Sequence, residues 1–353
     1  LGQAEAQQSD GRYQESTVVL EEALELARTR QDPIREAALL GALGNARIAM
    51  GESSAAASIF QTAVHLTRGI TMGVAKPVET PRDFAADSST FRLPEGLSSV
   101  LLNNLGNQQM VAGEPGKALK AYLESDRMAV AAEDWLHAAR SRANAASAAF
   151  RTDDIEQALE SLGLAREALL KAETTPAEET VIRIHLAQTG SFIAAIRSPE
   201  RNRAMLSAYE DLLAAIESAR KQGDLRSASH GLGSLGALYA QDYGRIRESF
   251  FLTRQAILIS EQAQAPDLMA RWKAQLGGLH AGAEDLSSAI PEYRTAVSLL
   301  ELTRPEASPI YGSAEVAFRA AVEPIYRKLT ELLIEANQSE SDEAQRQARY
   351  SEA

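Results

Sequence analysis

Apolar and small residues along the chain recur with the spacing of α-helices, and this spacing itself repeats about every 40 residues. In the clearest unit, Ala56, Phe60 and Ala63 stand at positions i, i+4 and i+7, which places them on one face of a helix. A helix carrying Leu43-Gly44 precedes this stretch, and Gly51-Glu52 forms a turn between the two. The pattern therefore predicts a hairpin of two antiparallel helices whose small residues allow close approach.

A small residue that follows a larger one three positions earlier marks the second helix of each unit. The marker residues are Ala23, Ala63, Ser125, Ala165, Ala215, Ala256 and Ala296. Five of the six intervals are 40 to 50 residues, and the other, 125−63=62, contains an insertion. A period in this range is the signature of a stacked-repeat array. We therefore expect an all-α, right-handed superhelical solenoid of about seven helical hairpins with a C-terminal capping helix.

The repeats divide the chain into an array and a C-terminal connector. The array is expected to span residues 1–303, with a long insertion loop at 69–96 that is either a mobile surface segment or folds back across the first helices through Phe84, Phe91 and Leu93. The first helix at 177–197 is expected to be long, and the turn at 241–245 to hold an extra residue. Residues 304–353 are expected to form a connector and capping helix that leads to a downstream domain, because the sequence reads as a piece of a longer protein.

The order Leu-Gly, small residue, turn and Ala-x3-Phe-x2-Ala resembles the tetratricopeptide repeat (TPR). It recurs as Leu105-Gly106 with Tyr122, and as Leu276-Gly277 with Tyr293. The usual period of that family is about 34 residues, so these helix pairs should be longer by about six residues. The resemblance implies a module that binds a protein or an extended peptide on the concave face formed by the first helices.

Polar residues of the first helices are the candidate peptide-binding residues. Counting Leu-Gly as repeat positions 7 and 8, most of them stand at positions 2, 6 or 9: Asn45, Asn103, Asn104, Asn107, Arg140, Asn144 and Ser147, with Arg271 and Gln275 nearer the C-terminus. An asparagine amide both donates and accepts, so a row of them could hold a peptide backbone whatever its side chains. In the alternative interpretation, the asparagines cap turns or bond neighbouring helices, and Arg271 and Gln275 lie on a solvated face.

Three of these residues, Asn45, Asn104 and Arg140, also match places in the carboxylate clamp of chaperone-binding TPR domains. Gly41 and Asn144 stand where that clamp has basic residues. Backbone binding is therefore favoured over the capture of a terminal carboxylate.

Composition narrows the classes of function. Lys and Arg total 36 against 48 Asp and Glu, a net charge of −12 that disfavours nucleic acid as a partner. The sequence has no cysteine and no apolar run long enough to span a membrane. Its five histidines lack metal-site spacing, and no phosphate-binding loop or catalytic constellation occurs. We expect a protein without cofactor, metal or enzymatic activity of its own, with the cytoplasm favoured as its location.

The C-terminal segment Ala317–Asn337 carries an apolar stripe interrupted by Pro324, which is expected to kink or restart the helix. The stripe comprises Phe318, Val322, Ile325, Leu329, Leu332 and Leu333. Glu323-Pro324 and Tyr326 within it resemble the connector of bacterial proteins in which TPR repeats precede a caspase-like CHAT domain. The resemblance implies the recognition or regulatory region of a CHAT-type peptidase, with the peptidase domain as a partner in the same polypeptide. The alternative is a self-associating structural scaffold with no peptidase partner.

Overall fold

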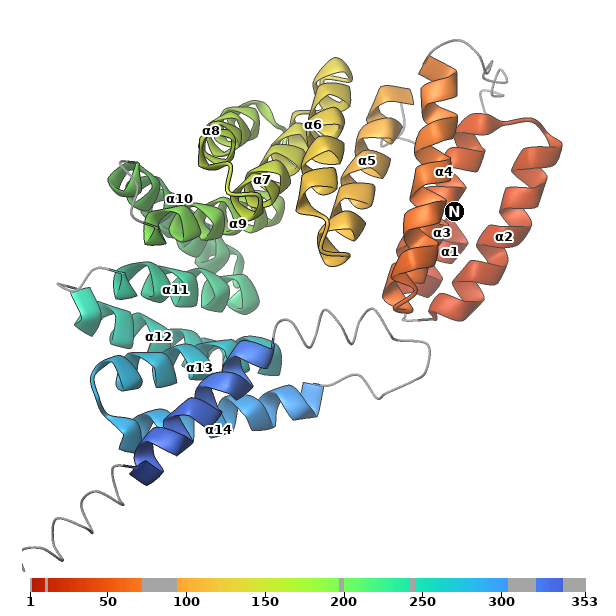
Figure 1. The fold of residues 1–353 in the computed structure, drawn as a ribbon. Helices are drawn as coiled ribbons and strands as arrows, with labels where there is room; N and C mark the ends of the chain where they lie inside the picture. The colour runs from red at the N-terminus through yellow and green to blue at the C-terminus, as the bar shows by residue number, and fades with distance from the viewer. Residues whose placement is uncertain are drawn as a thin grey trace, which may run out of the picture. The chain divides into compact units, whose positions relative to one another are not determined.

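The computed structural model describes residues 2–9, 12–71, 94–196, 200–241, 245–303 and 322–338, and regular structure in these ranges is entirely helical (Figure 1). The chain divides into two compact units. The first unit contains α1 (Gly2–Ser9), α2 (Tyr13–Thr29), α3 (Pro33–Ala49), α4 (Ser53–Thr71), α5 (Pro94–Val111), α6 (Pro115–Ala131), α7 (Trp135–Arg151) and α8 (Ile155–Lys171). The second contains α9 (Pro176–Ala195), α10 (Arg201–Gln222), α11 (Leu225–Ala240), α12 (Ile246–Gln262), α13 (Pro266–Gly282), α14 (Leu286–Thr303) and a helix at 322–338.

Consecutive helices pack as hairpins within each unit. In the part of the chain that the structure describes, α1 to α8 form four hairpins and α9 to α14 form three. The all-α repeat fold with seven hairpins, expected from the sequence, is thereby confirmed.

The Leu-Gly and aromatic positions pack against each other inside a hairpin. A Cβ atom at Gly44 would lie 2.7 Å from the Phe60 ring, and one at Gly106 would lie 2.5 Å from the Tyr122 ring. Glycine therefore lets the second helix bring its large side chain onto the first helix. Phe60 thus fills the space between the two helices of its own hairpin.

Short turns join the two helices of a hairpin and also join most neighbouring hairpins. Residues with positive φ occur in these turns, at glycines such as Gly51 and Gly113 but also at Glu133 and Asp153. An aspartate frequently follows and accepts a backbone N–H of the next helix, as Asp134 does from His137 at 3.0 Å.

Several boundaries differ from those expected. α4 continues to Thr71 and α5 begins at Pro94, so both ends of the predicted loop 69–96 are helical. Residues 72–93, which include Phe84, Phe91 and Leu93, lie outside the described residues. The predicted long first helix is α9, with 20 residues against 17 in α7. The α11–α12 connection at 241–245 is five residues long, against three between α7 and α8.

The helix at 322–338 packs on the last hairpin and so caps it. Its Leu332 is buried in a cluster with Ala289 and Tyr293 of α14. Leu333, which we placed on the same stripe, is exposed instead, because one residue turns a helix by about 100°. Phe318 lies outside the described residues.

The first helices form one side of each unit. α5 contacts both α3 and α7 in the first unit, and α11 contacts both α9 and α13 in the second. Among the described residues, second helices of successive hairpins make at most slight contact with each other. The first helices are therefore the closer-packed, inner side of each unit, as the repeat pattern predicted.

Candidate peptide-binding face

The first unit brings five of the predicted asparagines together. Asn45 lies on α3, Asn103, Asn104 and Asn107 on α5, and Asn144 on α7. Because these three helices are consecutive first helices in contact, their side chains form a row across three hairpins, which we call the amide row.

Hydrogen bonds connect the members of the amide row from helix to helix. The Nδ2 of Asn104 donates to the Oδ1 of Asn45 at 3.3 Å. The Nδ2 of Asn144 donates to the Oδ1 of Asn103 at 2.9 Å and to that of Asn107 at 3.4 Å. These asparagines therefore do bond neighbouring helices, as the alternative interpretation of the sequence held.

These bonds leave hydrogen-bonding capacity at the surface. Asn45 and Asn107 are exposed, and Asn103, Asn104 and Asn144 are half-buried. Each amide has two N–H donors and an oxygen that accepts two bonds. The bond between Asn104 and Asn45 uses one donor and one acceptor site, so both amides can also bond a ligand.

Asn107 differs from the others because it also serves the hydrophobic core. Its Oδ1 accepts a hydrogen bond of 2.8 Å from the hydroxyl of Tyr122, a side chain that is almost wholly buried. Burial of that ring raises the pKa of the Tyr122 hydroxyl, which therefore stays protonated as a donor. The core thus holds this member of the amide row in a defined position.

The remaining predicted residues of the first unit lie on α7. Arg140 and Ser147 are both half-buried there, three to four residues on either side of Asn144. Gly41 is buried, and a Cβ atom at this position would lie 2.8 Å from the Cδ2 of Leu101. A side chain at this position would have to displace the buried Leu101, which disfavours the lysine that a carboxylate clamp has there.

Arg271 and Gln275 lie on α13 in the second unit. The Nε2 of Gln275 donates to the carbonyl oxygen of Gly233 at 3.0 Å and to the hydroxyl of Thr253 at 2.7 Å. Both amide hydrogens of Gln275 are therefore used to join α13 to α11 and α12, and only its oxygen remains for a ligand.

A second polar row, which our sequence reasoning missed, crosses the first helices of the second unit. The Nε2 of Gln188 on α9 lies 2.7 Å from the Nε2 of His230 on α11, and an Nη of Arg271 on α13 lies 3.3 Å from the same atom. Since both neighbours are donors, that nitrogen accepts, and the proton of the neutral ring is on Nδ1. Burial first, and then the charge of Arg271, lower the pKa of His230 to about 4, so the ring is neutral at pH 7.

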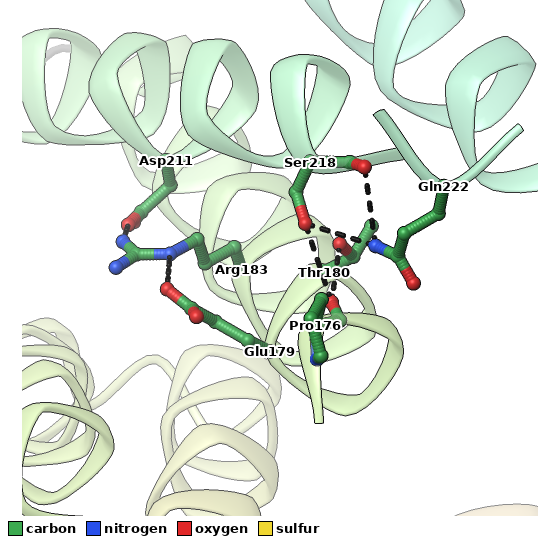
Figure 2. A network of polar contacts seen from close by, with 7 residues as sticks. All are labelled: Pro176, Glu179, Thr180, Arg183, Asp211, Ser218 and Gln222. Carbon is green, nitrogen blue, oxygen red and sulfur yellow. Dashed lines mark hydrogen bonds and ion pairs between the residues drawn. The ribbon is translucent and has the colours of Figure 1, made fainter. Parts of the chain in front are cut away.

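The first hairpin of this unit is held by polar contacts between α9 and α10 (Figure 2). Arg183 donates to Glu179 at 2.7 Å and to the buried Asp211 at 3.2 Å. Farther along, Thr180 and Ser218 both donate to the carbonyl oxygen of Pro176, at 2.7 and 3.4 Å. The contacts of Asp211 and Ser218 bond α10 to α9 and the other two lie within α9, so we assign all four to the scaffold rather than to a ligand site.

The described part of the chain brings no three His, Asp or Glu side chains together in a way that could hold a metal ion. None of its helices is both long enough and apolar enough to cross a membrane.

The fold defines the class of protein: a TPR-like array of helical hairpins. No protein-family model matches the sequence, and no curated protein matches it. Among solved structures, the chain is similar to the apo form of RapI, with a TM-score of 0.60 and 12% identity over 84% of this chain and 94% of that one. It is also similar to a chain of the Cut9–Hcn1 hetero-tetramer of APC/C, with a TM-score of 0.51 and 12% identity over 90% of this chain and 48% of that one. At such low identity these similarities support the fold alone.

Proposed function

We propose that this chain is a protein-binding module that holds an extended polypeptide across the amide row of the first unit. The observation that carries the proposal is the row itself, in which amides from α3, α5 and α7 reach the surface in hydrogen-bonded succession. A peptide backbone alternates N–H and C=O groups, and an asparagine amide can bond both. The face would thus select for an extended backbone rather than for particular side chains.

A protein-binding role is in keeping with one of the similar structures. Cut9 is described in a hetero-tetramer with Hcn1, so a chain with this type of fold takes part there in a protein assembly. Stacked hairpins in general present extended surfaces of the kind that polypeptides bind.

The experiment selects binders from a library of displayed unstructured peptides and measures the enriched ones by calorimetry. Asn45→Ala combined with Asn104→Ala is the sharpest variant, since these two amides bond each other and no buried group loses a partner. We expect the double variant to lose roughly tenfold or more in affinity, the equivalent of one or two hydrogen bonds, with an unchanged melting temperature.

Asn107→Ala is the informative comparison. It leaves the buried Tyr122 hydroxyl without its acceptor and should lower stability by about 1–3 kcal/mol. If the selected peptides bind the Asn45/Asn104 variant as tightly as the unaltered chain, or if no peptide is enriched, the amide row is not a peptide site.

We further propose that this binding regulates a CHAT-type peptidase. The support is the sequence Glu323-Pro324 with Tyr326, and the attachment of that helix to the last hairpin, where the Tyr326 hydroxyl bonds the carboxylate of Glu301 on α14. The test is to read the gene beyond Ala353 and to assay peptidase activity of the complete protein with and without a selected peptide. A gene that encodes no His/Cys caspase-like domain there would rule this role out, and this chain alone should not cleave substrates.

A further inference from the structure

Two second helices of the second unit expose apolar side chains on their outer sides. The exposed fractions are 59% for Leu206 and 43% for Leu213 on α10, and 61% for Phe251 and 55% for Leu258 on α12. The members of each pair are seven residues apart and so lie on one side of their helix. Both helices pack against α11, and these residues point away from the buried markers Ala215 and Ala256.

Counted from those markers, the outermost positions of the two helices are the same four, at nine, five and two residues before and two residues after (215−206=9 and 256−247=9). On α10 they hold Leu206, Glu210, Leu213 and Glu217. On α12 they hold Arg247, Phe251, Arg254 and Leu258. Wherever α10 has leucine, α12 has arginine, and wherever α10 has glutamate, α12 has an apolar residue. We call these eight residues the outer stripe.

The charged residues of the outer stripe make no ion pair with another helix in the described part of the chain. Glu210 and Arg247 are exposed and make no ion pair in the described part of the chain. Arg254 lies over the ring of Phe250 in its own helix, 5.8 Å from the ring centroid. Glu217 pairs only with Lys221, one turn away in α10, in a solvent-exposed contact.

Second helices elsewhere lack this pattern. At the same four positions α8 has three glutamates and a glycine, and α14 has Ser287, Pro291, Arg294 and Ser298. Val18 of α2 is also exposed at one of these positions, but two exposed apolar residues at them in one helix are a feature of α10 and α12.

We propose that a second copy of this chain binds the outer stripe, with a two-fold axis running along α10 and α12. Such an axis places α10 of each copy against α12 of the other, in parallel, with equal positions facing each other. Each leucine of α10 then meets the aliphatic stem of an arginine, and Phe251 and Leu258 face the aliphatic stems of Glu210 and Glu217 of the second copy. The carboxylate of Glu210 lies between the charged groups of Arg247 and Arg254 of the second copy, so the contact is complementary in charge.

The proposed contact goes beyond peptide binding and is independent of it. It uses second helices of the second unit, whereas the amide row uses first helices of the first unit. Four side chains per helix form a small interface, so the dimer is weak and dissociates on dilution.

The test is sedimentation velocity of the full chain over a range of concentrations, with two charge-reversed variants. In Arg247→Glu/Arg254→Glu both helices are acidic, and in Glu210→Arg/Glu217→Arg both are basic, so neither variant can pair with itself. Mixed together they are complementary again. We expect the unaltered chain to form a dimer, each variant alone to associate at least ~10-fold more weakly because like charges meet, and the equimolar mixture to regain the dimer.

The control is Arg294→Glu, one charge reversal at the position on α14 that corresponds to Arg254, and it should leave association unchanged. Since all the altered residues are exposed, circular dichroism should show unchanged helix content. The proposal is overturned if the unaltered chain remains a monomer at every concentration, if either variant associates as well as the unaltered chain, or if the mixture stays monomeric. A loss of peptide binding in the Asn45/Asn104 variant would not bear on any of these outcomes.

Discussion

Gly106 is the position at which a single methyl group best tests the packing of the hairpins. It lies in the middle of α5, and a Cβ atom there would come within 2.5, 2.7 and 2.9 Å of three ring atoms of Tyr122. The ring is buried, and its hydroxyl is fixed by Asn107, so it has little room to move. Gly106→Ala should therefore force α5 and α6 apart.

The magnitude follows from two opposing terms. Alanine is favoured over glycine inside a helix by about 1 kcal/mol. Inserting a methyl group into a packed core costs about 1–3 kcal/mol. We expect a net loss in the free energy of unfolding of about 1 kcal/mol for Gly106→Ala. Gly163 on α8 has no atom within 4 Å of its hypothetical Cβ, so Gly163→Ala should instead gain about 0.5–1 kcal/mol.

Urea unfolding followed by circular dichroism measures both variants, and a double variant isolates the contact. The next hairpin combines Ala146 with Leu162 at the positions of Gly106 and Tyr122. Gly106→Ala in a Tyr122→Leu background copies that combination, and there the alanine should stabilise. The resulting coupling energy should be about 1–3 kcal/mol. If Gly106→Ala raises the urea midpoint as much as Gly163→Ala does, the close approach of α5 and α6 is not required and the reasoning fails.

Three further outcomes follow from the same packing and charges. Ala165→Leu should lower the free energy of unfolding by about 1–3 kcal/mol, because Ala165 is fully buried between the helices of its hairpin, and thermal denaturation measures the loss. His230 has a folded-state pKa lowered to about 4 from an ordinary 6.5, so the unfolded chain takes up the proton first as the pH falls. The contribution of the neutral His230 ring to stability should be complete above pH ~6.5, and the free energy of unfolding should decrease by up to about 3 kcal/mol as the pH falls to 4. Melting curves recorded across this pH range should show a smaller decrease in His230→Gln. An equal pH dependence in that variant would contradict the assignment. Asp211→Ala should lower the free energy of unfolding by about 2 kcal/mol, because the side chain is buried and Arg183 then keeps only Glu179 as a partner. Glu179→Ala, at the exposed end of the same contact, should lower it by less than about 1 kcal/mol. Similar urea midpoints for the two variants would argue against a buried ion pair.

The hairpins could be predicted because their signal is steric and local. Leu-Gly followed by a large side chain such as Phe60 or Tyr122 leaves one way for two helices to pack, and the structure has that contact. The amide row was also predictable as residues on one face. Its internal bonds were not, since the bond of Asn144 to Asn103 joins residues 41 apart, and only the packed helices decide which amides meet.

The contact between Gln188 and His230 was not predicted either, because it too joins residues that are far apart in the sequence. We considered histidines for metal-site spacing, and His230 has no such neighbours in sequence. The signal that could have revealed the second row is the repeat itself, because Gln188, His230 and Arg271 are separated by 42 and 41 residues. Similarly, no sequence rule assigns the Tyr122 hydroxyl to Asn107, fifteen residues away.

The positive φ angles at the turns mark positions where substitutions could raise the stability of this chain. Among the residues that the structure describes, five other than glycine adopt them: Gln31, Glu133, Asp153, Gln264 and Glu284. Each holds a left-handed conformation that glycine adopts without steric penalty, so exchange to glycine at several turns would raise thermal tolerance by increments of up to about 1 kcal/mol. Because none of these five residues belongs to the amide row, an evolving lineage could use such increments to tolerate destabilising changes in what the module recognises.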